Sequence, residues 1–249
     1  MALYGLIGKT LKHSFSKQYF TDKFQREGIE ASYELFELPE IADFQALLRQ
    51  YPGISGLNVT IPYKEAVIPF LDYLSPEAER IGAVNTIIPT AKGLEGHNTD
   101  VVGFEQSLRE SWSGAWPTGA LVLGSGGAAK AVTFVLTHKL GIGHVLTVSR
   151  HPKGPQEISY DELTQLDWQE YRIVVNTTPL GMYPQVDARP ELPYQKFALG
   201  HLAFDLTYNP SETAFMAAAA SFGANAANGL RMLVLQAEKS WELWNGAGA

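Results

Sequence analysis

Polar side chains gather in four short segments that lie at the ends of predicted strands or open a predicted helix. The segments are His13-Ser14-Phe15-Ser16, Asn58-Val59-Thr60-Ile61-Pro62-Tyr63-Lys64, Gly82-Ala83-Val84-Asn85-Thr86 and Asn98-Thr99-Asp100. Hydroxyl and amide groups can each fix one oxygen of a small polar molecule, and a lysine can hold and deliver a proton. As a set, these residue types are suited to binding and transforming a small polar molecule.

Each of these residues also has a simpler structural interpretation. Ser14 and Ser16 stand where capping serines are common, and Asp100 is a suitable N-cap for a helix over residues 101–109. Pro62 stops the preceding strand, so that Lys64 follows at a loop edge, where lysines are usually solvated. No single one of them decides the chemistry.

A glycine-rich turn lies in the second half of the chain. Gly124-Ser125-Gly126-Gly127-Ala128 joins a predicted strand over residues 120–123 to a predicted helix over residues 128–140. Glycines let the backbone approach a pyrophosphate closely, and the helix N-terminus supplies unpaired N–H groups and the positive end of a dipole. Such a turn can have a purely structural role, in which it only reverses the chain. Its place between a strand and a helix, however, predicts dinucleotide binding.

The residues after the next strand favour NADP over NAD. NAD sites place an acidic residue here to hold the ribose hydroxyls, whereas this strand ends in Ser149-Arg150-His151. The Arg150 guanidinium can clamp a 2′-phosphate with charge-assisted hydrogen bonds and stack on adenine. A solvated surface arginine is the alternative interpretation.

Composition narrows the class of protein. The 249 residues are 45% hydrophobic and 18% charged, which suffices for a core and excludes wholesale disorder. The net charge of −7 argues against nucleic acid as a partner, and no apolar stretch reaches the ~20 residues that span a bilayer. Cysteine is absent and the histidines form no His-Glu-x-x-His pair, so no metal site is expected. Because the start lacks signal-peptide features, we expect a soluble, cytoplasmic protein.

Hydrophobic patterning predicts two successive α/β halves. The first half has predicted strands over residues 3–8, 33–38, 54–59 and 83–89, a helix over 16–26, and a second helix that Pro39 opens and Pro52-Gly53 ends. The second half has predicted strands over 120–123, 144–148, 172–175, 202–206 and 224–227 and helices over 128–140, 212–221 and 230–244. Strand, glycine-rich turn, helix and strand in this order form a βαβ nucleotide-binding unit.

Taken together and in this order, the motifs resemble those of the shikimate dehydrogenase family across nearly the whole chain. The second half adds Asn176-Thr177-Thr178-Pro179-Leu180-Gly181-Met182, Asp205-x-x-Tyr208-x-Pro210 and Asn228-Gly229-Leu230-x-Met232-Leu233-x-x-Gln236-Ala237. The Asn-Val-Thr-x-Pro-x-Lys and Asn-Thr-Asp elements are highly specific in combination, whereas the glycine turn is not. The resemblance implies an NADPH-dependent enzyme that reversibly reduces 3-dehydroshikimate to shikimate in the pathway through chorismate to the aromatic amino acids.

The resemblance implies a role for each matching residue. Lys64 and Asp100 form the catalytic pair at the reacting oxygen, because an alkoxide formed by hydride transfer needs a proton donor. The residues that bind the substrate or lie near it are Ser14, Ser16, Asn58, Thr60, Asn85, Tyr208 and Gln236. The residues that bind NADP are Gly124, Gly126, Gly127, Ala128, Ser149, Arg150, Thr177, Gly229 and Met232.

Three segments depart from the family pattern. After the second serine, Lys17, Tyr19 and Phe20 replace a common Pro and His-Asn, which we expect to alter helix packing more than chemistry. His151 ends a segment that is usually Asn-Arg-Thr, and it could reshape NADP recognition. Lys130 replaces a frequent arginine and gives a point charge instead of a planar fork.

Three alternative functions remain open. A quinate/shikimate-type dehydrogenase of the same fold would use NAD as well as NADP, and Arg150 argues against it. A methylenetetrahydrofolate dehydrogenase also joins a small α/β domain to a nucleotide-binding unit, but the paired serines and Asn-Thr-Asp argue against it. A non-catalytic sensor of a metabolite or cofactor could lose Lys64 or Asp100, yet both residues are present.

The expected architecture is α/β with two domains. Residues 1–100, completed by residues 229–249, form a substrate-binding and catalytic domain, and residues 101–228 form a Rossmann-like NADP-binding domain. We expect a monomer or a homodimer whose partner is a small-molecule substrate, not a nucleic acid or a membrane.

Overall fold

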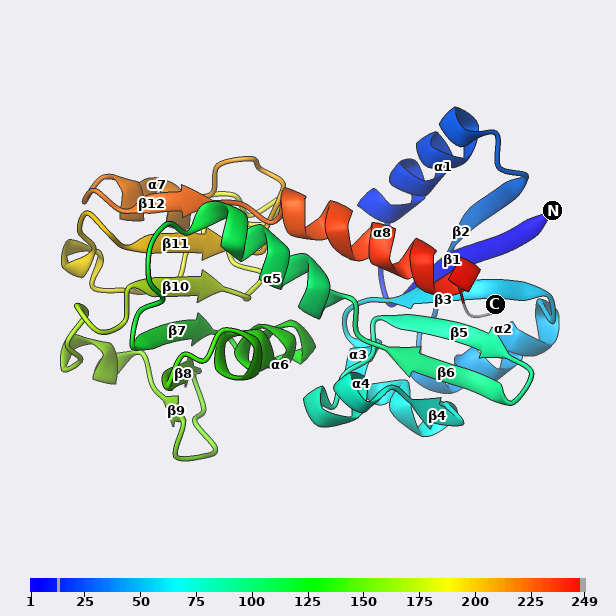
Figure 1. Ribbon diagram of the computed structural model, residues 1–249, viewed down its shortest axis with the longest axis horizontal. Helices are drawn as coiled ribbons and strands as arrows, with labels where there is room; N and C mark the ends of the chain where they lie inside the picture. Colours follow the sequence, from blue (N-terminus) through cyan, green and yellow to red (C-terminus); the bar gives the residue numbers. More distant parts are fainter. Residues whose placement is uncertain (13, 247–249) are drawn as a thin grey trace. The chain divides into compact units, whose positions relative to one another are not determined.

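Two six-stranded sheets organise the computed structural model, which describes residues 1–12 and 14–246 (Figure 1). The chain divides into two units around these sheets: unit 1 holds Met1–Thr99 and Ala237–Ala249, and unit 2 holds Asp100–Gln236. The predicted α/β class is confirmed. His13, which opens the first sequence motif, lies outside the described residues.

Unit 1 is built on a mixed sheet in the order β2-β1-β3-β5-β6-β4. Its strands are β1 (Ala2–Gly8), β2 (Ala31–Glu37), β3 (Ile54–Val59), β4 (Tyr73–Leu74), β5 (Thr86–Thr90) and β6 (Gly93–His97). Its helices are α1 (Phe15–Glu27), α2 (Phe44–Gln50), α3 (Tyr63–Ala66), α4 (Pro76–Ile81) and the later turns of α8 (Leu230–Gly246). Strands β1, β2 and β3 are parallel, and β5 runs antiparallel to β3 with Thr86 opposite Asn58. The carboxyl end of β3 therefore meets the start of β5.

Alternation of side chains along β1 supplies a core on each face of this sheet. Ile7 packs into a cluster with α2, whereas Tyr4 and Leu6 pack into the opposite cluster. The opposite cluster gathers aromatic side chains from α1, β2 and α8, namely Phe20, Phe24, Tyr33, Trp241 and Trp244. Trp244 stacks on Tyr4 with ring centroids 4.9 Å apart and donates its indole N–H to the carbonyl oxygen of Ile87 at 3.1 Å. Helix α8 thus completes the core of unit 1.

Unit 2 is a parallel sheet in the order β12-β11-β10-β7-β8-β9. Its strands are β7 (Gly119–Leu123), β8 (His144–Val148), β9 (Glu157–Ile158), β10 (Ile173–Asn176), β11 (Leu202–Asp205) and β12 (Asn225–Ala227). Its helices are α5 (Asp100–Ser111), α6 (Gly127–Phe134), α7 (Ala214–Ala220) and the first turns of α8. Counted from β7, this is the 3-2-1-4-5-6 order of doubly wound dinucleotide folds, in which ligands bind at the carboxyl ends of the strands where the order reverses. That point lies between β7 and β10.

Short elements account for the differences from the predicted pattern. The helix expected over residues 128–140 is α-helical only to Phe134 and continues as a π-helical turn, Val135–Lys139. The strands β4 and β9 have two residues each, and the helix α3 has four. Elements of this length cover little more than one hydrophobic period, so no repeat could indicate them.

The unit boundaries follow the packing of two helices. The chain divides inside α8, between Gln236 and Ala237, whereas the sequence pattern places the boundary at residue 229. Helix α8 approaches α5 so closely that a Cβ on Gly103 would lie 2.6 Å from the carbonyl oxygen of Met232. The other boundary falls between Thr99 and Asp100, where α5 begins. The first turns of α8 therefore group with α5 in unit 2.

Gly56 of β3 lies so close to the Trp244 ring that a side chain at this position would not fit. A Cβ at Gly56 would lie 2.6 Å from Cε2 of the buried Trp244 ring, so that ring or strand must shift. We expect Gly56→Ala to lower the free energy of unfolding by about 1–3 kcal/mol through overpacking. Urea unfolding measures the effect. Gly53→Ala is the control because nothing among the described residues lies within 4 Å of its Cβ position; equal stability of the two variants would contradict the packing argument.

Candidate active site

The start of helix α1 carries the two predicted substrate-binding serines. Ser14 occupies the N-cap position, but its side chain makes no capping hydrogen bond. The Ser14 hydroxyl is buried and has no hydrogen-bond partner among the described residues. A buried hydroxyl without a partner costs about 1–3 kcal/mol, so capping does not account for Ser14. Ser16 lies in the first turn of α1 and is buried.

Asn58, near the end of β3, has its amide satisfied within unit 1. Its Nδ2 donates to the Asn85 carbonyl oxygen at 3.2 Å, to Thr86 Oγ1 at 3.2 Å and to Ser240 Oγ at 2.9 Å. Its Oδ1 accepts from the Tyr33 hydroxyl at 2.8 Å. Asn58 is 5% exposed. The structure therefore shows Asn58 holding its neighbours in place.

Thr60 and Lys64 follow β3 on a turn and on the short helix α3. The Thr60 N–H donates to the carbonyl oxygen of Ile7 at 2.9 Å, which ties the turn to the end of β1. The Lys64 carbonyl oxygen accepts from the Val84 N–H at 2.7 Å. Lys64 is half-buried. The backbone of the lysine is thus anchored to the residue that precedes Asn85.

Asn85 is clamped by the residue that precedes Asp100. The Thr99 N–H donates to Asn85 Oδ1 at 2.7 Å, and Asn85 Nδ2 donates to Thr99 Oγ1 at 3.0 Å. Thr99 Oγ1 lies 3.1 Å from Ser240 Oγ. Asp100 then begins α5 and is buried, at a helix end whose dipole favours a negative charge.

Two buried hydroxyls complete this polar network without having stood out in the sequence. Tyr33 lies in a strand whose alternation makes it look like a core aromatic residue, and burial raises the pKa of its hydroxyl well above the usual value, so it remains a donor. Ser240 lies in an amphipathic helix. Its spacing of four residues from Gln236, which puts both on one helix face, was the available signal.

The glycine turn after β7 lies at the switch point of the second sheet. Gly124 has φ 104°, a conformation that glycine adopts without strain, and a Cβ there would lie 2.8 Å from Thr177 Oγ1. Gly126 is the N-cap of α6, and no described atom lies within 4 Å of its Cβ position. The first turn of α6, with Gly127 and Ala128, can therefore receive a phosphate at its N–H groups.

Three further predicted NADP-binding residues lie near this turn: one is an exposed cation, and two have side chains that hydrogen-bond to the backbone. Arg150 follows β8, is exposed, and forms no ion pair within the part of the chain that the structure describes. Ser149 is buried, and its Oγ accepts from the His151 N–H at 3.2 Å. The Thr177 hydroxyl donates to the Leu123 carbonyl oxygen at 2.6 Å. Ser149 and Thr177 thus shape the loops that present Arg150 and the glycine turn.

The buried carboxylate of Asp205 organises the end of β11, ahead of Tyr208. It accepts from Asn176 Nδ2 at 3.2 Å, from the Thr207 N–H at 2.9 Å and from the Thr213 hydroxyl at 2.7 Å. Burial raises the pKa of Asp205 above its ordinary value, although these hydrogen bonds oppose the rise. Tyr208 follows on this fixed segment and is half-buried.

Gly229 leads from β12 into α8 at a close backbone approach. Its N–H donates to the Thr207 carbonyl oxygen at 3.0 Å, and a Cβ on Gly229 would overlap the carbonyl oxygen of Leu206. Met232 and Gln236 follow on α8, and both are buried. Glycine is therefore required where the strand end and the helix start meet.

The predicted site residues are distributed over both units. Unit 1 contains Ser14, Ser16, Asn58, Thr60, Lys64 and Asn85, and unit 2 contains Asp100, Tyr208, Gln236 and all the predicted cofactor residues. Residues 1–12 and 14–246 hold no group of three or more His, Asp or Glu side chains arranged to bind a metal ion. None of their helices combines the length and apolar composition that a bilayer span requires.

Comparison with known proteins decides the family. A family model for the shikimate dehydrogenase substrate binding domain matches residues 6–87. The NADP(+) shikimate dehydrogenase of Clostridium beijerinckii is 40% identical over 260 residues, which cover 98% of this chain and 92% of that protein. This chain belongs to the shikimate dehydrogenase family.

Solved structures of the family share the whole fold. Shikimate dehydrogenase 1 from Peptoclostridium difficile has a TM-score of 0.88 and 38% identity, covering 99% of this chain and 92% of its own. Shikimate 5-dehydrogenase from Thermus thermophilus, solved in complex with NADP(H) and shikimate, has a TM-score of 0.86 and 33% identity, covering 99% and 94%. The resemblance drawn from the motifs is confirmed.

The three donors around Asp205 give a testable stability effect. Asp205→Ala should lower the free energy of unfolding by about 1–3 kcal/mol, because those donors lose their acceptor. As the pH rises from near 4, the unfolded state releases the proton of Asp205 while the folded state, with its raised pKa, retains it. The advantage of the wild-type protein should therefore decrease between pH 4 and pH 7.

Urea unfolding at both pH values measures this advantage. The exposed Asp161→Ala provides the control, since it removes a carboxyl group of the same unit from solvent-accessible surface. An advantage of the wild-type protein that grows with pH would show that the carboxylate form is the stabilising one.

Proposed function

We propose that this chain catalyses the NADP-dependent interconversion of shikimate and 3-dehydroshikimate, a step in aromatic biosynthesis. The observation that carries the proposal is likeness over both units to a relative solved with NADP(H) and shikimate. The buried Ser14 hydroxyl without a partner supports it, because a ligand oxygen would satisfy that hydroxyl.

Unit 1 supplies most of the groups for the substrate in this proposal. Ser14 and Ser16 bind the carboxylate, and Thr60 and Asn85 bind further oxygens, with Tyr208 and Gln236 contributed by unit 2. The Asn85 amide suits this role because Thr99 fixes its orientation from both sides. Asn58 acts through the hydrogen bonds that hold Asn85 and Ser240.

Lys64 and Asp100 carry the proton chemistry. When shikimate is oxidised, its hydroxyl loses a proton to the Lys64 amine as hydride leaves the carbon. In the reverse direction the ammonium returns the proton and stabilises the developing negative charge on the oxygen. In this proposal Asp100, a negative charge at the start of α5, orients the ammonium group.

Unit 2 has the features that NADP binding requires. The N–H groups at the start of α6 would hold the pyrophosphate, and the exposed Arg150 would hold the 2′-phosphate. Gly229 and Met232 would lie beside the nicotinamide ring. The bound cofactor supplies or accepts the hydride. Unit 1 is thus proposed as the substrate-binding unit and unit 2 as the NADP-binding unit.

A spectrophotometric assay of the purified chain tests the function. With shikimate we expect faster reduction of NADP than of NAD, and with quinate we expect little or no reduction of either. Turnover of quinate with NAD at a similar rate would favour the quinate/shikimate alternative, and no turnover with any pair would favour a sensor. The same preparation, run by light scattering, tests the proposed monomer or homodimer.

The catalytic pair gives the sharpest kinetic expectation. Lys64→Ala should lower kcat by at least ~10²-fold, the usual effect of losing a general acid–base, with a smaller change in shikimate KM. Asp100→Asn keeps the size but removes the charge, so it should also lower kcat. If the two residues act as one unit, the double variant will be far less impaired than the product of the single effects.

Steady-state rates at saturating NADP and shikimate measure the three variants. Lys92→Ala is the control, since Lys92 is an exposed lysine in unit 1. Near wild-type turnover in Lys64→Ala would leave Lys64 as a solvated loop residue and remove it from the mechanism.

Cofactor choice tests Arg150 separately. Arg150→Ala should raise the KM for NADP by roughly 10- to 100-fold, the effect of losing hydrogen bonds to a charged group, and should leave the KM for NAD nearly unchanged. Only NADP carries the phosphate that the guanidinium can clamp. Lys153→Ala, an exposed cation three residues further on, is the matched control. Equal changes for both cofactors would exclude the phosphate clamp.

A further inference from the structure

Ser240 of helix α8 lies within the polar network of unit 1 and is fully buried. Its Oγ lies 2.9 Å from Asn58 Nδ2, 2.8 Å from Thr86 Oγ1 and 3.1 Å from Thr99 Oγ1. These partners belong to β3, to the start of β5 and to the residue before α5. One hydroxyl therefore joins three segments that lie far from it in the sequence.

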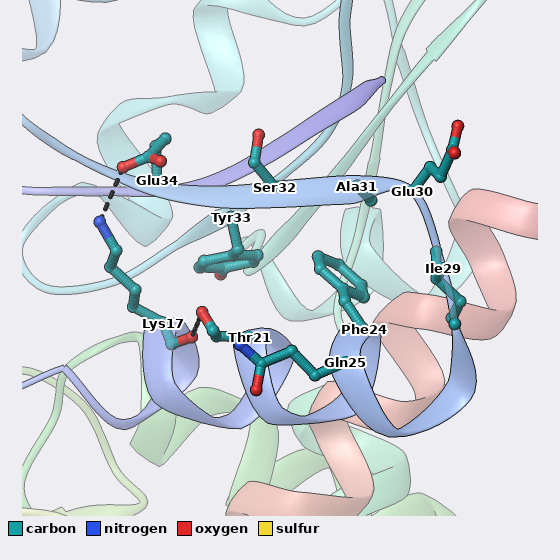
Figure 2. Close-up of a pocket in the computed structure, with 11 residues that line it drawn as sticks. Lys17, Thr21, Phe24, Gln25, Ile29, Glu30, Ala31, Ser32, Tyr33 and Glu34 are labelled. Atoms are coloured by element: carbon teal, nitrogen blue, oxygen red, sulfur yellow. Dashed lines mark hydrogen bonds and ion pairs between the residues drawn. The ribbon is translucent and has the colours of Figure 1, made fainter.

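Asn58 keeps other partners if the Ser240 hydroxyl is removed. The Asn85 carbonyl oxygen can only accept, so Asn58 Nδ2 faces it at 3.2 Å and Asn58 Oδ1 faces Tyr33. Tyr33 projects from β2 toward α1 beside a surface groove and donates its hydroxyl proton to this Oδ1 at 2.8 Å (Figure 2). Nδ2 also has Thr86 Oγ1 at 3.2 Å. The orientation of the Asn58 amide thus does not depend on Ser240.

The Thr99 hydroxyl lies between Ser240 and the amide of Asn85. Thr99 Oγ1 is 3.0 Å from Asn85 Nδ2 and 3.1 Å from Asn85 Oδ1, so it can either accept from this amide or donate to it. When its proton points to Ser240 Oγ, a lone pair remains for the proton of Nδ2. Without Ser240 the proton can turn to Asn85 Oδ1, or to Thr86 Oγ1 at 3.3 Å. If it turns to Oδ1, Nδ2 loses Thr99 as an acceptor.

The amide of Asn85 is held at both ends. Its Oδ1 accepts from the Thr99 N–H at 2.7 Å and from the Thr86 hydroxyl at 3.1 Å, and its Nδ2 donates to Thr99 Oγ1. An amide nitrogen carries two N–H donors in the plane of the group, so fixing one of them also fixes the direction of the other. An amide ordered in advance binds a substrate oxygen without the cost of being ordered on binding.

We propose that Ser240 is a positioning residue for substrate binding, which accepts the Thr99 hydroxyl proton and so keeps the Asn85 amide in the orientation that binds a substrate oxygen. The proposal rests on the proposed function, since it needs the Asn85 role assigned there. Ser240 itself touches neither the reacting atoms nor the cofactor. Its loss should therefore weaken shikimate binding and leave the chemical step and NADP binding unaffected.

Ser240→Ala tests this, because it removes one oxygen and places a good helix former in α8. Titration calorimetry should show the Kd for shikimate rising roughly 3- to 10-fold, the effect of one net hydrogen bond. The value of kcat at saturating shikimate and the Kd for NADP should stay within about twofold of wild type. Ser107→Ala is the matched control, since Ser107 is a buried serine of helix α5 in unit 2 and takes no part in the hydrogen bonds described above.

A double-mutant cycle with Thr99→Val shows whether Ser240 acts through Thr99. Valine has the shape of threonine and keeps the backbone N–H that donates to Asn85 Oδ1, but it has no hydroxyl. In this background Ser240→Ala should change the Kd for shikimate by less than about twofold. Thr99→Ser keeps the hydroxyl and should bind shikimate nearly as well as the wild-type chain.

A full effect of Ser240→Ala in the Thr99→Val background would overturn the proposal. So would an unchanged Kd for shikimate in Ser240→Ala, or parallel losses in shikimate and NADP binding. A lower kcat at an unchanged Kd would place the effect at Asp100, which follows Thr99, and would also overturn it. A wild-type chain that does not turn over shikimate would instead contradict the proposed function.

Discussion

A buried amide must satisfy each of its donors and acceptors, and the amide of Asn58 meets this requirement with groups from two strands and one helix. Its partners belong to β2, to the start of β5 and to α8, while Asn58 itself lies near the end of β3. Leaving one such group unpaired costs about 1–3 kcal/mol, a large share of the stability of a domain. The end of β3 and the start of β5 are therefore held together, and both are held to β2 and α8. Thr60 and Asn85, which are proposed to bind substrate, stand next to these two strand ends.

In unit 2, close packing of the backbone, more than side-chain hydrogen bonds, fixes the elements relative to one another. Where unit 1 uses a network of polar side chains, unit 2 brings backbones so close that a single Cβ would not fit. Gly103 lies against the carbonyl oxygen of Met232, and Gly229 lies against that of Leu206. Unit 2 also has a buried polar cluster around Asp205, which fixes the segment that leads to Tyr208. Close backbone approach suits a cofactor that is recognised through N–H groups, whereas a polyhydroxylated acid requires side-chain oxygens and amides.

The polar network of unit 1 and the close backbone packing of unit 2 differ in how well they could be predicted from the sequence. Glycine-rich turns and apolar strands can be recognised in the sequence alone, so the alternation of elements and the glycine turn at Gly124 could be predicted. Residues of the network were visible only where they form a family motif, as Asn58 and Asn85 do. Tyr33 and Ser240 were missed because a tyrosine in an alternating strand and a serine in an amphipathic helix have ordinary structural explanations. Their partners are more than 20 residues away in the sequence, and only the fold brings them together.

The division of α8 between the units affects how the protein can be made. Trp241 and Trp244 belong to the aromatic core of unit 1, yet they leave the ribosome only after all of unit 2 has been synthesised. Unit 2 is continuous in the chain and can close its parallel sheet during synthesis. Unit 1 must wait with Tyr4, Phe20 and Tyr33 uncovered until the last helix arrives. The N-terminal half of the chain is thus translated first and completed last, and its exposed aromatic residues are the surface that chaperones would meet in the meantime.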